Sequence, residues 1–354
     1  MAAQKRPLVP ALDGLRAVAS LIVLLSHYSN ETGFLRFYAG WGAGQVGVIL
    51  FFALSGFLMC YVTEGLAPTR ANILTFWQRR IARVLPLFYF IVLLSYFLGK
   101  QTLGGESLLV YKVTDENLLG HLLLMKGASV LWTIPVEICF YMVFPAIWYL
   151  RTRLNNDSLL ILILLVITIF WVTFCEYAWA AMNTDIQFLA LIRRAHVFLL
   201  GIVAYLVFNM AGPMRTNWLW LALMLLVPLN FPHFARMVLE RRFDPWVDPA
   251  VLLILPCLLL ATVRSDWAEQ VLGNPVLRYL GNISYSLYLT HRLVLEYMQK
   301  FYVLDKSLLS LATVSILAVA LSSVTYFLIE KPSRSYLNRL GRKRPVQATS
   351  AAGP

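Results

Sequence analysis

The sequence predicts an all-α, polytopic membrane protein with about ten transmembrane helices and both termini in the cytoplasm. The first observation is composition: 59% of the 354 residues are hydrophobic and only 14% are charged, whereas soluble domains carry about 25% charged residues. The second is size, because a soluble chain of this length could not bury so much apolar surface in one core. The third is that the apolar residues gather in runs of about 20, the length of a helix that crosses a bilayer.

Ten such windows follow one another along the chain. Their expected limits are Ala11–Asn30, Gly44–Glu64, Ile81–Gly99, Trp132–Leu150, Ser158–Trp179, Ile186–Asn209, Thr216–Phe231, Asp248–Arg264, Leu280–Gln299 and Ser307–Glu330. The polar segments between the windows are short, so no soluble domain is left over. We therefore expect one membrane domain over residues 1–330, followed by a basic and partly disordered cytoplasmic tail over residues 331–354.

The first apolar run resembles a secretory signal, because Lys5 and Arg6 precede it. However, Asp13 and Arg16 interrupt the approach to the run, and no A-x-A cleavage site follows it. We therefore expect a first helix that the mature protein retains.

The distribution of Lys and Arg predicts the orientation. With the N-terminus inside, the inner loops and tail carry nearly twice as many Lys and Arg residues as the outer loops, as the positive-inside rule requires. The net charge of +12 is thus explained by membrane orientation. A nucleic-acid site would need exposed basic surface with interleaved aromatic or polar residues, so we expect no nucleic-acid partner.

Ionisable residues inside the expected spans predict the functional site, because a charge at the bilayer centre costs about 2.5–3.5 kcal/mol on insertion scales. Arg16 and His27 lie eleven residues apart in the first span, so they share one helix face at a separation of about 16 Å. A long ligand that is anionic at one end and reactive at the other would contact both, and a coenzyme A thioester has that shape. The ordinary alternative is that Arg16 reaches lipid phosphates and His27 lies at the outer interface.

Two further arginines open the third span on the expected cytoplasmic side. Arg80 and Arg83 are three residues apart, so they share a helix face and could bind phosphates. Anchoring of the helix by the positive-inside rule is the alternative interpretation.

Two more ionisable residues are expected near the depth of His27. Glu137 lies one or two turns into the fourth span, and His291 lies in the outer half of the ninth. Several ionisable groups at one depth favour a polar cavity over separate structural roles. We interpret His121, His196 and His233 as loop or interface residues.

These residues lie within motifs that resemble the acyltransferase-3 family, bacterial membrane proteins that O-acylate polysaccharides, lipopolysaccharide and other sugars. The matching segments, in the family's order, are Leu12–Ala17 with His27, Leu50–Leu58, Arg79–Pro86, Trp132–Tyr141, Phe198–Gly201, Leu280–His291 and Leu328–Pro332. The Arg-x10-His spacing, Ser-Gly-Phe-Leu and Ser-Tyr-Ser-Leu-Tyr-Leu together make the resemblance specific, and it covers nearly the whole chain.

The resemblance implies a role for each matching position. His27 corresponds to the family's essential histidine and Arg16 to its arginine partner. The remaining positions are the Arg-x-x-Arg pair, the buried acid and the serine of Ser-Gly-Phe-Leu, which are Arg80 with Arg83, Glu137 and Ser55.

The sequence departs from the family pattern at three positions. Ile138 follows Glu137 where many members have a second acid, and Thr290 and Arg292 flank His291 where many have Trp. These changes leave the acceptor and the acyl group open.

We therefore expect an O-acyltransferase of the bacterial inner membrane that uses cytoplasmic acyl-CoA, with acetyl-CoA as the first candidate, and a carbohydrate acceptor. His27, Glu137 and His291 are the expected catalytic residues, and Arg16, Arg80, Arg83 and Ser55 the expected donor-binding residues. Membrane lipids and a polysaccharide assembly complex are further expected partners, and no ligand spacing indicates a metal. The alternatives are a transporter of a lipid-linked sugar or anionic substrate, since prolines interrupt several spans, and a scaffold without activity.

Overall fold

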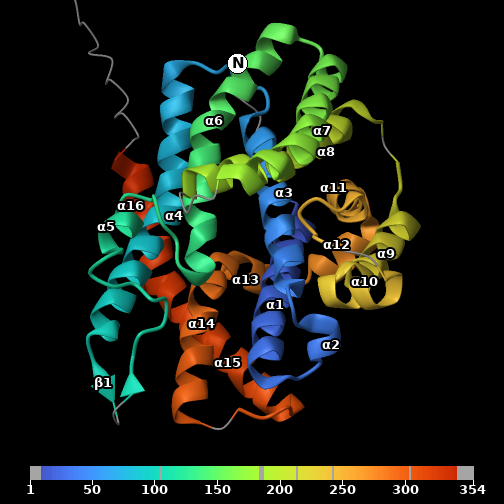
Figure 1. Ribbon diagram of the computed structural model, residues 1–354. Coiled ribbons are helices and arrows are strands. Elements are labelled where there is room, and N and C mark those ends of the chain that lie inside the picture. Colours follow the sequence, from blue (N-terminus) through green and yellow to red (C-terminus); the bar gives the residue numbers. More distant parts are fainter. Residues whose placement is uncertain are drawn as a thin grey trace, which may run out of the picture.

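The computed structural model describes residues 9–103, 106–182, 187–212, 214–240, 243–302 and 304–340, which form an almost entirely helical protein (Figure 1). The elements of the first half are α1 (Pro10–Thr32), α2 (Arg36–Ala39), α3 (Ala43–Thr63), α4 (Arg70–Gly99), β1 (Thr102–Leu103), β2 (Glu106–Ser107), α5 (Leu118–Leu122), η1 (Ser129–Trp132), α6 (Thr133–Leu154) and α7 (Asp157–Met182). Those of the second half are α8 (Gln187–Met210), α9 (Asn217–Leu226), η2 (Pro228–Asn230), α10 (Pro232–Leu239), α11 (Pro249–Val263), α12 (Asp266–Leu272), α13 (Pro275–Asn282), α14 (Ser284–Phe301), α15 (Leu308–Thr325), η3 (Tyr326–Glu330) and α16 (Lys331–Leu340). The all-α prediction is confirmed, apart from the antiparallel pair of two-residue strands β1 and β2.

The described part of the chain contains seven helices that are long and apolar enough to cross a membrane, or up to nine if each of two bent pairs is one span. In the bent pairs, α9 with η2 meets α10 at 83° and α11 meets α12 at 91°. The expected number of ten is therefore not confirmed. The span missing from this count is α14, which covers most of the expected ninth window. It carries Arg292, Glu296 and Lys300 within its 18 residues, so it is less apolar than a lipid-facing helix.

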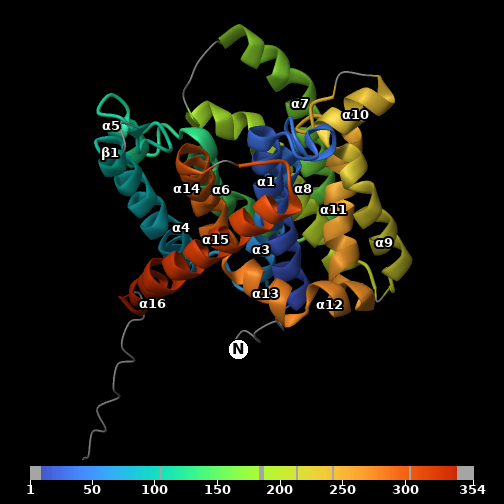
Figure 2. The same cartoon turned by 90° about the horizontal axis from the view of Figure 1, so that it is seen from below.

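The long helices run between two ends of the molecule (Figure 2). α12, α13 and α16 lie at one end, which we call the α12 end, and α5, β1 and α10 lie at the other, the α10 end. The short helix α2 belongs to the α10 end because it packs against α10. Which end faces the cytoplasm stays a prediction.

Close packing of α3 on α8 fixes the centre of the bundle. A Cβ atom on Gly56 would lie 2.2 Å from the carbonyl oxygen of Phe198, and one on Gly201 would lie 2.0 Å from that of Ala53. Glycine at both positions allows the two backbones to touch, as small residues do in membrane helix pairs. Two motifs of the sequence, around Gly56 and Gly201, thus meet in space for a packing reason.

The expected tail begins as a helix. Lys331–Leu340 continues directly from the π-helical turn η3 into α16. This helix packs on α4, where the Gln78 side-chain amide donates a hydrogen bond to the carbonyl of Leu337. Residues 341–354 of the expected tail lie outside the described residues.

Candidate functional site

A small cavity of about 70 Å³ lies where α1, α3, α4, α6 and α14 meet. Its polar and charged lining residues are Arg16, Ser55, Arg80, Arg83, Thr133, Glu137, Tyr141, Ser284, Tyr285 and Tyr288. Hydrophobic side chains, including Val48, Phe51, Phe52 and Leu58, form much of the remaining wall. Five of the seven site residues expected from the sequence therefore line one cavity.

Three guanidinium groups face this cavity from two helices. Arg16 comes from the second turn of α1, and Arg80 and Arg83 come from the middle of α4. None of the three lies within ion-pair distance of a carboxylate among the described residues. Cations in an apolar bundle normally pair with an acid, so this cluster is suited to an anionic ligand.

The Arg80 side chain is held between aromatic rings. Its guanidinium carbon lies 5.6 Å from the ring centres of both Phe76 and Tyr141, a distance at which a cation is attracted to the ring face. Arg80 is buried in this environment. The rings fix the guanidinium, which forms no ion pair with a carboxylate among the described residues.

Glu137 is the carboxylate of the cavity, and two hydroxyl groups donate to it. Ser55 from α3 donates to its Oε1 at 3.2 Å, and Tyr141, one turn further along α6, donates to the same oxygen. Donors to the ionised form stabilise a carboxylate. Ser55 therefore contacts Glu137 in this structure, a pairing that could not be predicted from the sequence.

His27 and His291 pack against each other beside the cavity, and neither lines it. Their ring centres are 5.1 Å apart and the ring planes are tilted by 39°. His291 is almost fully buried, and its Nδ1 lies 3.1 Å from the carbonyl oxygen of Leu287. This contact assigns the proton to Nδ1 and leaves Nε2 as an acceptor, for which no partner exists among the described residues. The structure thus places His291 against His27, while Glu137 has no described contact with it.

Tyr288 joins the cavity to the histidine pair. Its side chain lines the cavity, and its ring centre lies 6.1 Å from that of His291. Its hydroxyl donates to the carbonyl of Val130 at 3.1 Å, which ties α14 to the turn before α6. Tyr288 and Tyr141 were not predicted as site residues. The signal available for them was spacing: Tyr288 precedes His291 by three residues and Tyr141 follows Glu137 by four.

Arg292, by contrast, is satisfied by two acids. Its guanidinium contacts Glu31 of α1 at 2.8 Å and also Glu296, one turn along α14. Glu31 follows His27 by four residues, so this ion pair connects the two helices one turn from the histidine pair. Arg292 is therefore occupied in holding α1 to α14 and is not available to select an anionic acyl group.

His121, interpreted from the sequence as a loop or interface residue, lies in the short helix α5 before α6. Its Nδ1 lies 2.8 Å from the carbonyl of Asn117, and its Nε2 lies 3.0 Å from the backbone N–H of Ala128. It is buried, and burial lowers the pKa of His121. A neutral ring with its proton on Nδ1 satisfies both contacts, so His121 closes the loop before α6.

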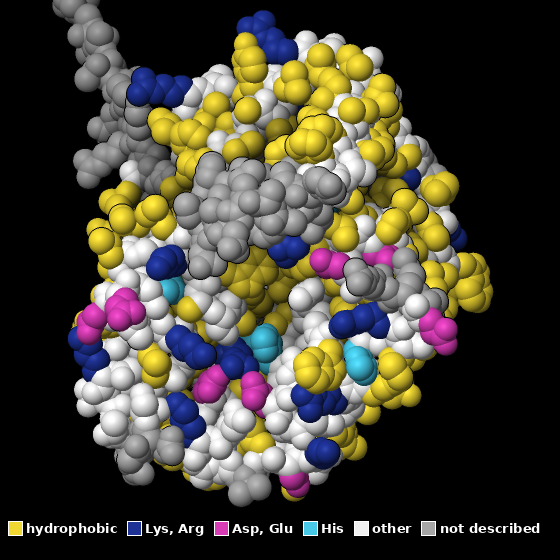
Figure 3. Space-filling model, viewed as in Figure 1, with side chains coloured by type: hydrophobic (Ala, Val, Ile, Leu, Met, Phe, Trp, Pro, Cys, Tyr) yellow, Lys and Arg dark blue, Asp and Glu magenta, His cyan; other side chains and the backbone are white. Residues whose placement is uncertain are grey.

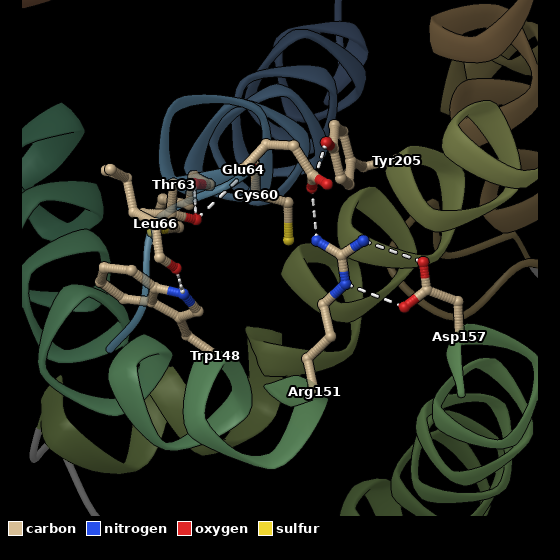
Figure 4. A network of polar contacts seen from close by, with 9 residues as sticks. Cys60, Thr63, Glu64, Leu66, Trp148, Arg151, Asp157 and Tyr205 are labelled. Carbon is tan, nitrogen blue, oxygen red and sulfur yellow. Dashed lines mark hydrogen bonds and ion pairs between the residues drawn. The ribbon is translucent and has the colours of Figure 1, made fainter. Parts of the chain in front are cut away.

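A second polar network lies away from the cavity (Figure 4). Arg151 of α6 contacts Glu64 at 2.5 Å and Asp157 at 2.8 Å, and Tyr205 donates to Glu64 at 2.6 Å. The network joins the end of α3 to α6, α7 and α8. Its charges are paired, and it lies away from the residues that line the cavity, so we interpret it as a structural junction.

One face of the molecule combines polar groups with a hollow (Figure 3). Hydrophobic side chains form the floor of the hollow, and histidine, basic and acidic side chains gather at its edge. Elsewhere, no group of three or more His, Cys, Asp and Glu side chains within the described ranges is arranged to hold a metal ion.

Comparison with known proteins connects this arrangement to a family. A family model described as "Acyltransferase domain", of the acyltransferase-3 type, matches residues 9–327. The chain belongs to this acyltransferase family. Membership makes it a multi-pass membrane acyltransferase that moves groups other than amino-acyl groups. The transporter and scaffold alternatives receive no support from this comparison.

Three relatives illustrate the family. The chain is 25% identical to Acyltransferase MdmB of Streptomyces mycarofaciens over 96% of its own length and 94% of the relative. It is 25% identical to a Staphylococcus aureus (strain COL) protein that carries the provisional name O-acetyltransferase, over 94% of this chain and 58% of the relative. The third is Peptidoglycan O-acetyltransferase OatA of Listeria monocytogenes, 25% identical over 81% of this chain and 49% of the relative. The chain thus spans only about half the length of the last two. No solved structure matches the chain.

Proposed function

We propose that the protein transfers an acyl group, acetyl in the first instance, from acyl-CoA to a hydroxyl group of a sugar. The observation that carries this proposal is the cavity lined by Arg16, Arg80 and Arg83, none of which forms an ion pair with a carboxylate among the described residues, next to a pair of histidines. The names of two relatives, which specify O-acetyl transfer, support the acetyl group. A carbohydrate acceptor is suggested by peptidoglycan in the name of the Listeria relative.

Donor binding follows from charge. The phosphates of a CoA thioester are anions, and guanidinium groups bind phosphate through paired, charge-assisted hydrogen bonds. The Arg16 side chain lies about 16 Å along α1 from His27, a distance that the extended arm of the donor can bridge. The phosphates would bind at the arginines and the thioester would lie toward Tyr288 and the histidine pair.

In the chemical step, His27 acts as general base. It takes the proton of the sugar hydroxyl while the oxygen forms a bond to the acyl carbon, and the carbon–sulfur bond breaks. The proton then passes to the leaving thiolate, so that CoA leaves as a thiol and His27 returns to its neutral form. His291, whose Nε2 is a free acceptor, would hold the His27 ring by accepting from it. In the alternative route the acyl group passes first to His27 and then to the acceptor.

Glu137 has a supporting role in this mechanism. Its carboxylate, fixed by Ser55 and Tyr141, lies in the same cavity as the three arginines. It offsets one of their charges and orients the Tyr141 ring, against which Arg80 packs. We expect it to set the position of the donor and not to exchange a proton with His27.

The location of the enzyme follows from the positive-inside rule. The basic loops and tail would face the cytoplasm of a bacterial inner membrane, where acyl-CoA is available. The α12 end, which includes the basic helix α16, would then be cytoplasmic, and the acceptor would reach the α10 end. Membrane lipids surround the spans, and a polysaccharide assembly complex is a candidate partner.

Acyl transfer from acetyl-CoA labelled in the acetyl group would test the proposal in isolated membranes. We expect label in the glycan fraction with wild type, and its loss in Arg16→Ala and Arg83→Ala. Lys100→Ala is the matched control, because Lys100 is an exposed cation paired with Asp115 outside the cavity. Equal labelling in all four samples, or label from neither acetyl-CoA nor succinyl-CoA, would contradict the proposal.

A further inference from the structure

The α10 end carries a group of aromatic side chains that the proposed mechanism does not use. We call it the aromatic platform and define it as Phe37, Tyr38 and Trp41 from the segment around α2, together with His233 and Phe234 from α10. The rings contact one another: Phe37 and His233 are 5.4 Å apart, and Tyr38 stacks on Phe234 at 5.7 Å. Trp41 lies 6.5 Å from His233. The five rings therefore form one continuous surface.

This surface is exposed and is not packed into the core. Phe37, Tyr38 and Trp41 are 38%, 52% and 51% exposed. Arg36 adds a charge, since its guanidinium carbon lies 4.3 Å from the centre of the Trp41 ring. The guanidinium thus steadies the indole by a cation–π contact. Exposed aromatic clusters of this kind mark binding surfaces, because isolated exposed rings are common but contiguous patches are not.

The backbone holds the platform in a conformation that costs free energy. Leu35 and Trp41, on either side of α2, have φ values of 46° and 48°, in the left-handed region that bulky residues avoid. Such a strained conformation persists only where surrounding contacts hold the backbone in it, and strained residues are concentrated at functional sites. Here the Asn30 side chain holds the backbone, because its Oδ1 accepts a hydrogen bond from the N–H of Trp41 at 2.7 Å.

Asn30 also fixes the platform relative to the reaction centre. It lies on α1, three residues after His27, so less than one helical turn separates the two. The platform is thereby attached to the same helix that carries the proposed general base. On the face shown in Figure 3, hydrophobic, histidine and basic side chains also gather to one side of the hollow.

We infer that the aromatic platform binds the sugar acceptor and presents its hydroxyl group to His27. The inference rests on the proposed function and adds to it the acceptor subsite. The C–H face of a pyranose ring is apolar and matches the electron-rich face of an aromatic ring. Exposed Trp and Tyr side chains offer such faces at low entropic cost. The ring pair Tyr38 and Trp41 would take successive sugars of a glycan, and Arg36 would contact its polar substituents.

The test is acetyl transfer by the full-length protein in membranes, with the envelope polysaccharide of the source organism titrated as acceptor and labelled acetyl-CoA in excess. We expect Trp41→Ala to raise the apparent KM for polysaccharide about tenfold, the loss typical of truncating one aromatic anchor, while Trp41→Phe recovers most of it. CoA release without acceptor should not change. Trp218→Ala is the matched control, since Trp218 is 75% exposed and contacts Trp267 of α12, far from the platform.

The outcomes separate the two proposals. Wild type that transfers no acetyl group to polysaccharide would contradict the proposed function itself. Active wild type with an unchanged KM in Trp41→Ala and in Tyr38→Ala would overturn the platform alone. Equal losses in Trp41→Ala and Trp218→Ala would also overturn it, because both would then be anchoring the protein at the membrane interface. If Trp41→Ala fails to accumulate in the membrane, the apparent KM for polysaccharide is compared between Tyr38→Ala and Tyr38→Phe instead. A higher KM in Tyr38→Ala alone would support the platform, and equal KM values would overturn it.

Discussion

The rings of His27 and His291 lie 5.1 Å apart, although 264 positions separate them in the chain. The pair brings α1 against α14, and His291 keeps one ring nitrogen free of any described partner. A buried acceptor without a partner costs about 1–3 kcal/mol. We propose that the pair acts as a unit in which the imidazole of His27 reacts and that of His291 orients it.

His291→Ala should therefore lower kcat without abolishing it. The His27 ring would lose its neighbour but keep its basicity, and we expect a loss of about 10–100-fold, below the 10²–10⁴ typical of a general base. The measurement is the rate of acetyl transfer at saturating acetyl-CoA, with the amount of folded protein determined beside it. A loss as large as that of His27→Ala would mean that both rings react, and unchanged kcat would remove His291 from the site.

The ion pair between Arg292 and Glu31 should position the two histidines. Glu31→Gln removes the ion pair between α1 and α14, whereas Glu296→Gln removes a carboxylate from the same guanidinium within α14 only. We expect Glu31→Gln to lower kcat at least several-fold more than Glu296→Gln, with the KM for donor unchanged in both. Hydrogen bonds to charged groups contribute about 1.5–3 kcal/mol, so the thermal midpoint should fall in both variants. Equal kcat values in the two variants would refute the positioning role.

Glu137→Gln should weaken donor binding more than it slows the chemical step. The amide keeps an acceptor for Ser55 and Tyr141, but it places an N–H₂ group among hydroxyl donors. We expect this to displace the Tyr141 ring and the Arg80 guanidinium that packs against it. We expect a rise of about 3–30-fold in the KM for acetyl-CoA, equivalent to about 0.7–2 kcal/mol. Ser55→Ala removes one donor to the carboxylate and should have a smaller effect in the same direction. A drop in kcat alone, with the pH profile displaced, would instead assign Glu137 to proton transfer.

Gly56→Ala should destabilise the fold without touching the cavity chemistry. The added methyl would lie 2.2 Å from the carbonyl oxygen of Phe198, so α3 and α8 would have to separate. Overpacking of this kind costs about 1–3 kcal/mol, to be measured as a lower thermal midpoint of the purified protein. Gly212→Ala is the control, because nothing lies within 4 Å of a Cβ at that position. Equal midpoints for the two variants would contradict the close packing of α3 on α8.

Acid should open the loop that His121 closes. Its pKa is lowered by burial, so the folded state resists protonation while the unfolded state accepts a proton below about pH 6.5. The stabilisation is thus complete above about pH 6.5 and is lost as the pH falls toward the lower pKa of the folded state. Protonation would place an N–H on Nε2, facing the Ala128 N–H that it now accepts. The protection factor for hydrogen exchange at Ala128, which corrects the rate for the intrinsic pH dependence of amide exchange, should therefore fall in acid. A protection factor that does not change with pH would refute this.

The sequence could predict those features that are local to one helix. Apolar runs revealed most of the spans, and charges within them revealed Arg16, Arg80, Arg83 and Glu137, which do share a cavity. The count of ten was not confirmed, because α14 faces protein and carries charges that a lipid-exposed helix would exclude. For such a helix, a window of apolar residues does not separate a membrane span from a buried amphipathic helix.

What the sequence could not predict depends on packing between distant helices. The contact of His27 with His291 requires α1 to lie against α14, and the hydrogen bond from Ser55 to Glu137 requires α3 to lie against α6. Tyr141 and Tyr288 could be recognised only by their helical spacing from Glu137 and His291, which is a weak signal in a chain with 17 tyrosines. The pairing of Arg292 with Glu296 is visible in the sequence as an i, i+4 spacing, but its pairing with Glu31 could not be predicted, because Glu31 lies 261 positions away.

The most direct test of the central claim is acyl transfer by purified protein in proteoliposomes, comparing wild type with His27→Ala. Release of CoA from acetyl-CoA would be followed in the presence of envelope polysaccharide, with the thermal midpoint measured on the same preparations. We predict that His27→Ala folds normally and that its rate of acyl transfer is about 10²–10⁴-fold lower than that of wild type, which is the contribution of a general base. A folded His27→Ala protein that transfers acetyl within about twofold of the wild-type rate would contradict the account.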